Sequence, residues 1–268
     1  MKRTLSLWQP LVLASAILGT PLLAQAELKS EEIDYQVNGE NFTGYLAYDD
    51  DFQGERPGVL VVHEWWGHGD YVRKRADMLA ELGYTAFALD MYGSDKYAEH
   101  PEKANEFMQA VMSNQEAAKD RFESALELLR EQPTVATDQI AALGYCFGGA
   151  VVLNMARAGL DLDGVVSYHG MLSAETPASE GDIEAEVLVF TGEDDPMVPK
   201  AQVDSFKQEM RSANVDFKVH SYEGAQHAFT NPDATGKGEQ FELPLAYDAE
   251  ADADSWHKTQ RFLDRLFD

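Results

Sequence analysis

The 268-residue sequence is poor in cysteine and in basic residues, and both shortages restrict what the protein can be. Its one cysteine, Cys146, cannot form a disulfide within the chain, which excludes a scaffold held together by disulfides. Only 21 lysines and arginines stand against 47 aspartates and glutamates, which gives a formal net charge of −26. Such a charge repels nucleic acid and anionic membrane surfaces, so we expect neither as a partner.

Long apolar runs are also scarce, and the one at the N-terminus is too short and too interrupted by Pro10, Gly19 and Pro21 to span a membrane stably. Leu11–Leu18 follows the basic residues Lys2 and Arg3 and precedes the small-residue site Ala24–Ala26. This pattern predicts a secretory signal peptide over residues 1–26, cleaved near Ala26, with an uncleaved anchor as the alternative. We therefore expect an exported protein, periplasmic or secreted, with no membrane contact after cleavage. The remaining chain has 19 basic and 47 acidic residues, a net charge of −28.

Residues 27–268 predict one α/β domain, because apolar runs typical of buried strands alternate with segments of helical periodicity. Ile33–Val37 and Phe42–Tyr48, joined by Asn38-Gly39, predict an antiparallel hairpin. The stretch 231–254 reads as a long loop. The expected fold is a mostly parallel twisted sheet with helices on both faces. Its expected strands are Gly58–Val62, Thr85–Leu89, Ile140–Leu143, Val165–Val166, Val187–Phe190 and Phe217–Tyr222. Its expected helices are Asp70–Leu82, Pro101–Met112, Gln115–Arg130, Gly149–Ala158, Lys200–Ser212 and Ser255–Phe267.

One short motif lies where a predicted strand runs into a predicted helix. Residues 144–148 read Gly-Tyr-Cys-Phe-Gly, between the strand Ile140–Leu143 and the helical periodicity that begins at Gly149. Gly-x-Cys-x-Gly predicts a nucleophile elbow, whose central residue occupies a strained turn while the glycines leave room for crossing backbone. A thiol there lies beside a helix N-terminus, whose dipole favours the thiolate. A lone cysteine is usually buried and inert, but this setting indicates a nucleophile.

An acid and a base follow the cysteine in the order that α/β-hydrolases use. Asp195 comes just after the predicted strand Val187–Phe190, and His227 lies in a turn-like segment after the last strand. An acid in that place can orient the histidine, which can then activate Cys146. Four other histidines fall in helices, within a strand or ahead of the acid, which favours His227 as the base: His100, His257, His220 and His169.

Two segments suggest a metal site, but their spacing argues against it. In residues 63–68, His-Glu-Trp-Trp-Gly-His, the second histidine lies one residue too far along for the zinc motif H-E-x-x-H. The segment also follows a strand, whereas that motif needs a helix. The alternating acids of Asp248–Asp254 lack the turn glycine and terminal glutamate of a calcium loop. We therefore expect no metal ligands, and interpret Asp248–Asp254 as a solvated run before the last helix.

Four runs together resemble the dienelactone hydrolase family of α/β-hydrolases, and the resemblance covers roughly residues 33–267. They are Gly-Tyr-Cys-Phe-Gly-Gly at 144–149, Gly-x-x-Asp-x-x-Val-Pro at 192–199, Gly-x-x-His-x-Phe at 224–229 and His-Glu-Trp-Trp-Gly at 63–67. A further match is Leu-Asp-Met-Tyr at 89–92. The resemblance implies an α/β-hydrolase fold.

The resemblance also implies a chemistry: cleavage of a small ester, lactone or thioester through a covalent acyl-cysteine, with no cofactor. Cys146 would be the nucleophile, His227 the base and Asp195 the orienting acid. In this family the position of Glu64 contacts the resting thiol and helps to generate the thiolate. The backbone N–H groups of Trp65 and Phe147 would form the oxyanion hole.

The sequence departs from the family where dienelactone-cleaving members hold the substrate carboxylate with two arginines. One position follows residues 90–92, where this chain has Gly93-Ser94, and the other follows His227, where it has Thr230-Asn231. Burying a carboxylate without a cation is costly, so we expect a neutral substrate other than dienelactone. Aromatic side chains are expected to line its site: Trp65, Trp66, Tyr92, Tyr145 and Phe229.

Two non-hydrolytic functions could use the same fold. One is a binding protein that keeps the pocket but performs no catalysis, which a complete Cys146, Asp195 and His227 set argues against. The other is a thiol-redox sensor, which the lack of a second, resolving cysteine argues against.

Overall fold

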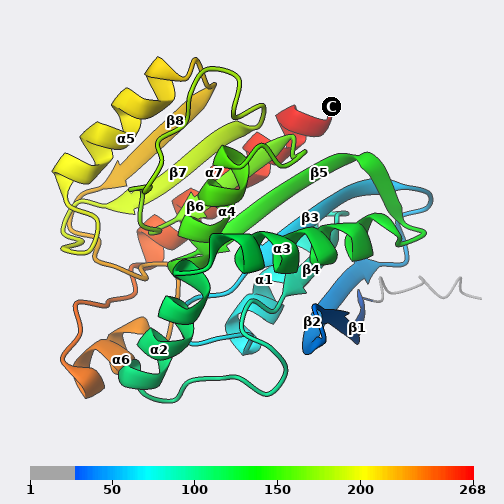
Figure 1. The fold of residues 1–268 in the computed structure, drawn as a ribbon, viewed down its shortest axis with the longest axis horizontal. Helices are drawn as coiled ribbons and strands as arrows, with labels where there is room; N and C mark the ends of the chain where they lie inside the picture. The colour runs from blue at the N-terminus through cyan, green and yellow to red at the C-terminus, as the bar shows by residue number, and fades with distance from the viewer. Residues whose placement is uncertain (1–27) are drawn as a thin grey trace, which may run out of the picture.

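The structure, a computed structural model, describes residues 28–268 and contains the predicted α/β architecture (Figure 1). Eight strands form one sheet in the order β1-β2-β4-β3-β5-β6-β7-β8. β1 and β2 form the expected antiparallel hairpin, which joins the sheet through antiparallel pairing of β2 with β4, and all other pairings are parallel. The strands are β1 (Leu28–Val37), β2 (Glu40–Asp49), β3 (Arg56–Val62), β4 (Thr85–Leu89), β5 (Val135–Tyr145), β6 (Gly164–Tyr168), β7 (Glu186–Gly192) and β8 (Phe217–Tyr222).

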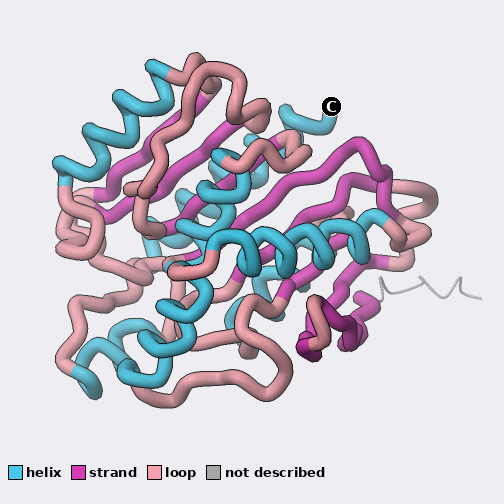
Figure 2. The backbone as a smooth tube through the Cα atoms, in the orientation of Figure 1, coloured by secondary structure: helices cyan, strands magenta, loops and turns pink. Residues whose placement is uncertain are grey.

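Helices cover both faces of the sheet, as Figure 2 shows. Residues of α3, α4 and α5 pack on one face, and residues of α1 and α7 pack on the other. The helices α2 and α6 lie together beyond one end of the sheet (Figure 1). The helices are α1 (Asp70–Ala80), α2 (Pro101–Met112), α3 (Gln115–Arg130), α4 (Phe147–Arg157), α5 (Lys200–Ser212), α6 (Ala234–Phe241) and α7 (Ala249–Phe267).

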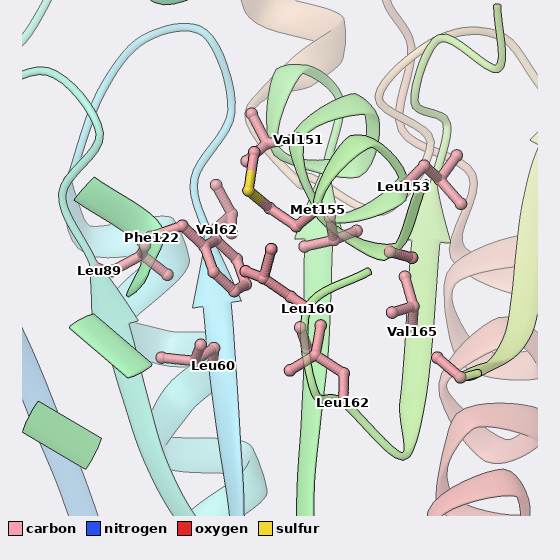
Figure 3. Close-up of a cluster of buried hydrophobic side chains, with 14 of the residues drawn as sticks. Leu60, Val62, Leu89, Phe122, Val151, Leu153, Met155, Leu160, Leu162 and Val165 are labelled. Atoms are coloured by element: carbon pink, nitrogen blue, oxygen red, sulfur yellow. The ribbon is translucent and has the colours of Figure 1, made fainter. Parts of the chain in front are cut away.

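The central strands are buried on both faces, which explains their continuous apolar sequence. Figure 3 shows one of these layers, in which Leu60 and Val62 of β3 lie with Phe122 of α3 and Met155 of α4. All four side chains are at most 2% exposed. Full burial of such a side chain stabilises the fold by roughly 1.5–3 kcal/mol. This core fixes the strand ends from which the candidate site is built.

The prediction of a loop over residues 231–254 is wrong. The segment contains α6, and α7 begins at Ala249, well before the expected Ser255. The carboxylate of Asp248 caps α7 by accepting hydrogen bonds from the N–H groups of Glu250 and Ala251. The alternating acids therefore belong to the start of a helix, where its dipole favours them. α6 escaped sequence reasoning because two of its eight residues are glycines, which weaken helical propensity.

The predicted signal peptide, residues 1–26, lies outside the described residues. Among the helices of residues 28–268, none combines the length and the apolar character needed to cross a membrane.

The strand order reverses between β3 and β5. After β3 the chain moves to β4 on one side, and after β5 it moves to β6 on the other. The loops at the carboxyl ends of these strands therefore diverge and leave a crevice, the usual ligand-binding place in open α/β sheets. His63 follows β3 and Cys146 follows β5, and Gly148 N–H donates to the carbonyl of His63 at 3.1 Å. The predicted catalytic residues thus lie at the edge where this fold binds ligands.

Candidate active site

Cys146 occupies a sharp turn between β5 and α4. Its φ of 54° lies in the left-handed region, where a non-glycine residue is strained. A Cβ at Gly144 would overlap the carbonyl of Gly148, and a Cβ at Gly148 would overlap the carbonyl of Val62. The two glycines of the motif are therefore required by the crossing backbone, as expected of an elbow. α4 begins at Phe147, immediately after the cysteine, so the thiol lies at the helix N-terminus.

In the structure the side chains of Cys146, His227 and Asp195 contact one another in series. Sγ of Cys146 lies 3.0 Å from Nε2 of His227, and Nδ1 of His227 lies 2.8 Å from Oδ2 of Asp195. His227 and Asp195 are buried, whereas the neighbouring Asp194 is exposed. Nδ1–H of His227 donates to Asp195, which leaves Nε2 to exchange a proton with the thiol.

The charges beside His227 favour its protonated form. Burial by itself lowers the pKa of His227, but the negative charge of the Cys146 thiolate and the hydrogen bond to Asp195 outweigh it and raise that pKa to about 10. At neutral pH this arrangement therefore favours an imidazolium at His227, which can support the thiolate, the form in which sulfur is a nucleophile.

Glu64 is buried beside the site but binds a different partner from the one expected. Its Oε2 accepts a hydrogen bond from the amide of Asn231 at 2.6 Å, while the thiol of Cys146 contacts His227. Burial raises the pKa of Glu64, against the lowering effects of Asn231 and of the charge on Lys237. The carboxyl group lines a polar cavity of about 430 Å³ between α1 and the segment that leads into α6. Asn231 is a site residue that sequence reasoning missed.

The two backbone N–H groups expected to form the oxyanion hole are free to donate hydrogen bonds to a substrate oxygen. Within residues 28–268, neither Trp65 N–H nor Phe147 N–H has a hydrogen-bond acceptor. The loop that carries Trp65 is held by His63, whose Nδ1–H donates to the carbonyl of Glu64 at 2.6 Å. Nε2 of His63 accepts from the N–H of Met91 at 3.1 Å. His63 therefore holds the backbone of the loop that carries Trp65, and both of its ring nitrogens have hydrogen-bond partners.

A cavity of about 470 Å³ opens beside the thiol. The polar side-chain groups among its lining residues come from Gln109, His227 and Cys146, and the other side chains are apolar or aromatic. None of its lining residues is a lysine, arginine, aspartate or glutamate in the part of the chain that the structure describes. The apolar wall is made by Trp65, Phe147, Ala150, Leu245 and four methionines.

Four of the aromatic residues expected to line the substrate site are placed elsewhere, so this part of the sequence interpretation is corrected. Trp66 lines the polar cavity beside Glu64. Tyr92 packs edge-on against His63 and donates its hydroxyl to the carbonyl of Trp65 at 3.1 Å. Tyr145 and Phe229 are fully buried against the α1 and α7 face. An aromatic residue next to a motif can thus serve the core, because successive residues of a strand point to opposite faces.

His169, set aside on sequence order, lies directly behind the triad. Its Nδ1 accepts from the N–H of Cys146 at 3.1 Å, and its ring lies 5.3 Å from that of His227 in an edge-to-face arrangement. Burial, with the charges of His227 and Arg75, holds the pKa of His169 well below its usual value, so the ring is neutral. Its Nε2–H therefore donates to Oγ1 of Thr230, at 2.8 Å.

The contacts behind His169 continue to a buried cation. Oγ1 of Thr230 lies 2.6 Å from the hydroxyl of Tyr71. Arg75 donates to the carbonyl of Thr230 at 2.8 Å and to Asp252 of α7 at 2.5 Å. A signal for His169 was present in the sequence, because it comes three residues after the apolar run Val165-Val166, near the carboxyl end of a predicted strand.

Comparison with known proteins places this arrangement among hydrolases. The model of the dienelactone hydrolase family matches residues 42–267. A curated relative, a candidate carboxymethylenebutenolidase of Synechocystis sp., is 26% identical over 248 residues, which are 88% of this chain and 96% of that protein.

Two solved structures are more similar in sequence. A dienelactone hydrolase-like promiscuous phosphotriesterase from metagenomic libraries is 34% identical, with a TM-score of 0.82, and the match covers 90% of this chain and 99% of that chain. A structure titled m3DLH is 36% identical, with a TM-score of 0.85 and the same coverage.

Proposed function

The chain belongs to the dienelactone hydrolase family, and from this premise we propose that it hydrolyses a small neutral ester, lactone or thioester through an acyl-cysteine on Cys146. The observation that carries the proposal is the alignment of thiol, imidazole and carboxylate, with distances of 3.0 Å and 2.8 Å. A buried, inert cysteine would not need this alignment, and nothing in a binding site requires it.

The first half of the proposed reaction transfers the acyl group to the enzyme. The thiolate of Cys146 attacks the substrate carbonyl carbon, and the carbonyl oxygen becomes an oxyanion held by the N–H groups of Trp65 and Phe147. The tetrahedral intermediate collapses to a thioester as the bond to the leaving oxygen breaks. Nε2–H of His227 protonates that oxygen, and the alcohol leaves.

The second half restores the enzyme. His227 takes a proton from water, and the resulting hydroxide attacks the thioester carbonyl in the same oxyanion hole. The carboxylic acid leaves, and the bond to sulfur breaks with return of the thiolate. Asp195 keeps the imidazole in one orientation and one tautomer through both halves. Glu64 would act electrostatically, since its buried carboxyl favours the positive charge on His227.

The preference for a neutral substrate follows from the side chains beside the thiol. The cavity holds no cation to pair with a substrate carboxylate. Dienelactone-cleaving relatives carry their two arginines in segments where this chain has Gly93-Ser94 and Thr230-Asn231. Ser94 bonds to Thr43, Thr230 belongs to the network behind His169, and Asn231 donates to Glu64. A buried, unpaired carboxylate costs several kcal/mol, so dienelactone itself fits poorly.

The test is hydrolysis of short-chain p-nitrophenyl esters by the purified protein under reducing conditions. We expect turnover that iodoacetamide abolishes and that Cys146→Ala lowers by at least about 10³-fold. The matched control is His257→Ala, an exposed histidine on α7, against His227→Ala: the first should keep full activity and the second should lose it. Undiminished turnover in Cys146→Ala would refute the acyl-cysteine mechanism.

A second candidate substrate class, neutral phosphotriesters, is favoured by the same uncharged cavity. The 34%-identical relative is described as a promiscuous phosphotriesterase, and an uncharged triester would meet no repulsion beside the thiol. Release of p-nitrophenol from a diethyl p-nitrophenyl phosphate tests this class with the same Cys146→Ala control.

A further inference from the structure

Methionines are concentrated around the candidate nucleophile. The sequence has nine methionines, and four of them line the apolar cavity beside Cys146. Met108 and Met112 are one turn apart on α2, Met171 follows β6, and Met197 follows β7. Three separate parts of the chain thus supply the same residue type to one wall.

Methionine gives a wall with particular properties. Its unbranched, polarisable side chain fills irregular gaps and adapts to ligands of different shape, as in other methionine-rich binding surfaces. Its thioether cannot neutralise a charge or replace the hydration of one. A site built from four such side chains therefore discriminates strongly on charge and weakly on shape.

Resting on the proposed hydrolase function, we infer that Met108, Met112, Met171 and Met197 bind the acyl group of the substrate and select an uncharged, apolar chain of several carbons. The cavity volume of about 470 Å³ lies within the range of sites for small organic ligands. Because the cavity includes the thiol and His227, an acyl group bound there has its carbonyl carbon beside the sulfur.

The first experiment compares kcat/KM for p-nitrophenyl acetate, butyrate, valerate and hexanoate with that for mono-p-nitrophenyl glutarate. Glutarate is valerate with its terminal methyl replaced by a carboxylate, so the pair differs in charge at nearly constant length. We expect kcat/KM to rise about threefold to fourfold per added methylene and to be at least about tenfold lower for glutarate than for valerate. A flat or falling series, or glutarate as good as valerate, overturns the inference.

The second experiment tests whether the flexibility of the methionine side chains, and not only their apolar character, determines which acyl groups bind. The double variant Met108→Leu/Met112→Leu keeps volume and apolar character but removes two flexible side chains. We expect its ratio of kcat/KM for hexanoate to kcat/KM for benzoate esters to change at least about fivefold. The control is Met210→Leu, a methionine of α5 buried in the core away from the cavity, which should leave the ratio unchanged. An unchanged ratio in the double variant as well would overturn the role of the methionines.

A binding measurement keeps the inference independent of the reaction. In Cys146→Ala, titration calorimetry should detect methyl hexanoate but not the adipate monomethyl ester anion, and Met112→Lys should weaken the former at least about tenfold. Binding without ester turnover by the unmodified protein would refute the proposed hydrolysis alone. Turnover of acetate with no preference among acyl groups would refute this inference alone.

Discussion

His227 lies between a thiol and a carboxylate, and these neighbours set its charge. Its raised pKa, about 10, means that folding favours the imidazolium. The stabilisation from this proton is complete below the unfolded pKa of about 6.5 and is lost as pH rises through about 10. The negative charge of Cys146 contributes more to this rise than the Asp195 hydrogen bond does.

The relative size of these two contributions to the pKa of His227 gives a prediction that nuclear magnetic resonance can check. In protein labelled with ¹⁵N-histidine, the His227 ring should remain protonated at pH 8. The pKa of His227 should fall in both Asp195→Asn and Cys146→Ala, and further in the cysteine variant, because the larger favourable charge is gone. A His227 ring that is neutral at pH 7 in the unmodified protein would contradict the ion-pair description of the site.

His169 offers a second prediction, because its two nitrogens have different partners. Asparagine can place an oxygen near Nδ1 and keep the acceptor for Cys146 N–H, whereas glutamine reaches the position of Nε2 and keeps only the contact with Thr230. We expect His169→Asn to retain most activity and His169→Gln to lose about tenfold to hundredfold in kcat with little change in KM. Equal kcat values in the two variants would show that His169 only fills space.

Among elements, the strand-to-helix turn at Cys146 depends on glycine because backbone crosses close to it on both sides. Gly148 lies against the carbonyl of Val62, so a methyl group there forces the backbone of β3 and α4 apart. We expect Gly148→Ala to lower the free energy of unfolding by at least about 2 kcal/mol. Gly236→Ala in α6 is the control, since nothing lies within 4 Å of its added Cβ. That control should raise stability by roughly 0.5–1 kcal/mol. Urea denaturation of both variants measures the difference.

The helices, strands and site residues differ in how well the sequence predicts them. The central strands were predictable because burial on both faces leaves an unbroken apolar run, as in β3 and β7. The order of Cys146, Asp195 and His227 followed from topology, since each comes at the carboxyl end of a parallel strand. α6 was not predictable, because tertiary contacts override the low helical propensity of its glycines. The cavity was missed for a related reason: Met108 and Met112 look like ordinary core positions of an amphipathic helix.

For the whole molecule, the excess of carboxylates is the dominant electrostatic feature. A formal charge of −26 on one chain causes self-repulsion, which weakens the compact state at low ionic strength. The Debye length falls from about 10 Å at 0.1 M salt to about 3 Å at 1 M. We therefore expect the melting temperature to rise by about 2–4 °C between 0.05 M and 0.5 M NaCl, equivalent to about 1 kcal/mol. KCl at equal concentration should act alike, and a fall in melting temperature would contradict the prediction.

Cys146 is the only cysteine of the chain, and it lies in the elbow at one end of the apolar cavity. Any thiol-specific reagent that reacts once per molecule therefore reports on this one turn. A chromogenic disulfide reagent therefore counts the molecules whose Cys146 thiol is reactive, with no signal from another cysteine. Specific activity can then be expressed per reactive molecule. A fluorophore or a heavy atom can be attached at the same sulfur in the unmodified sequence, with no need to engineer a background first.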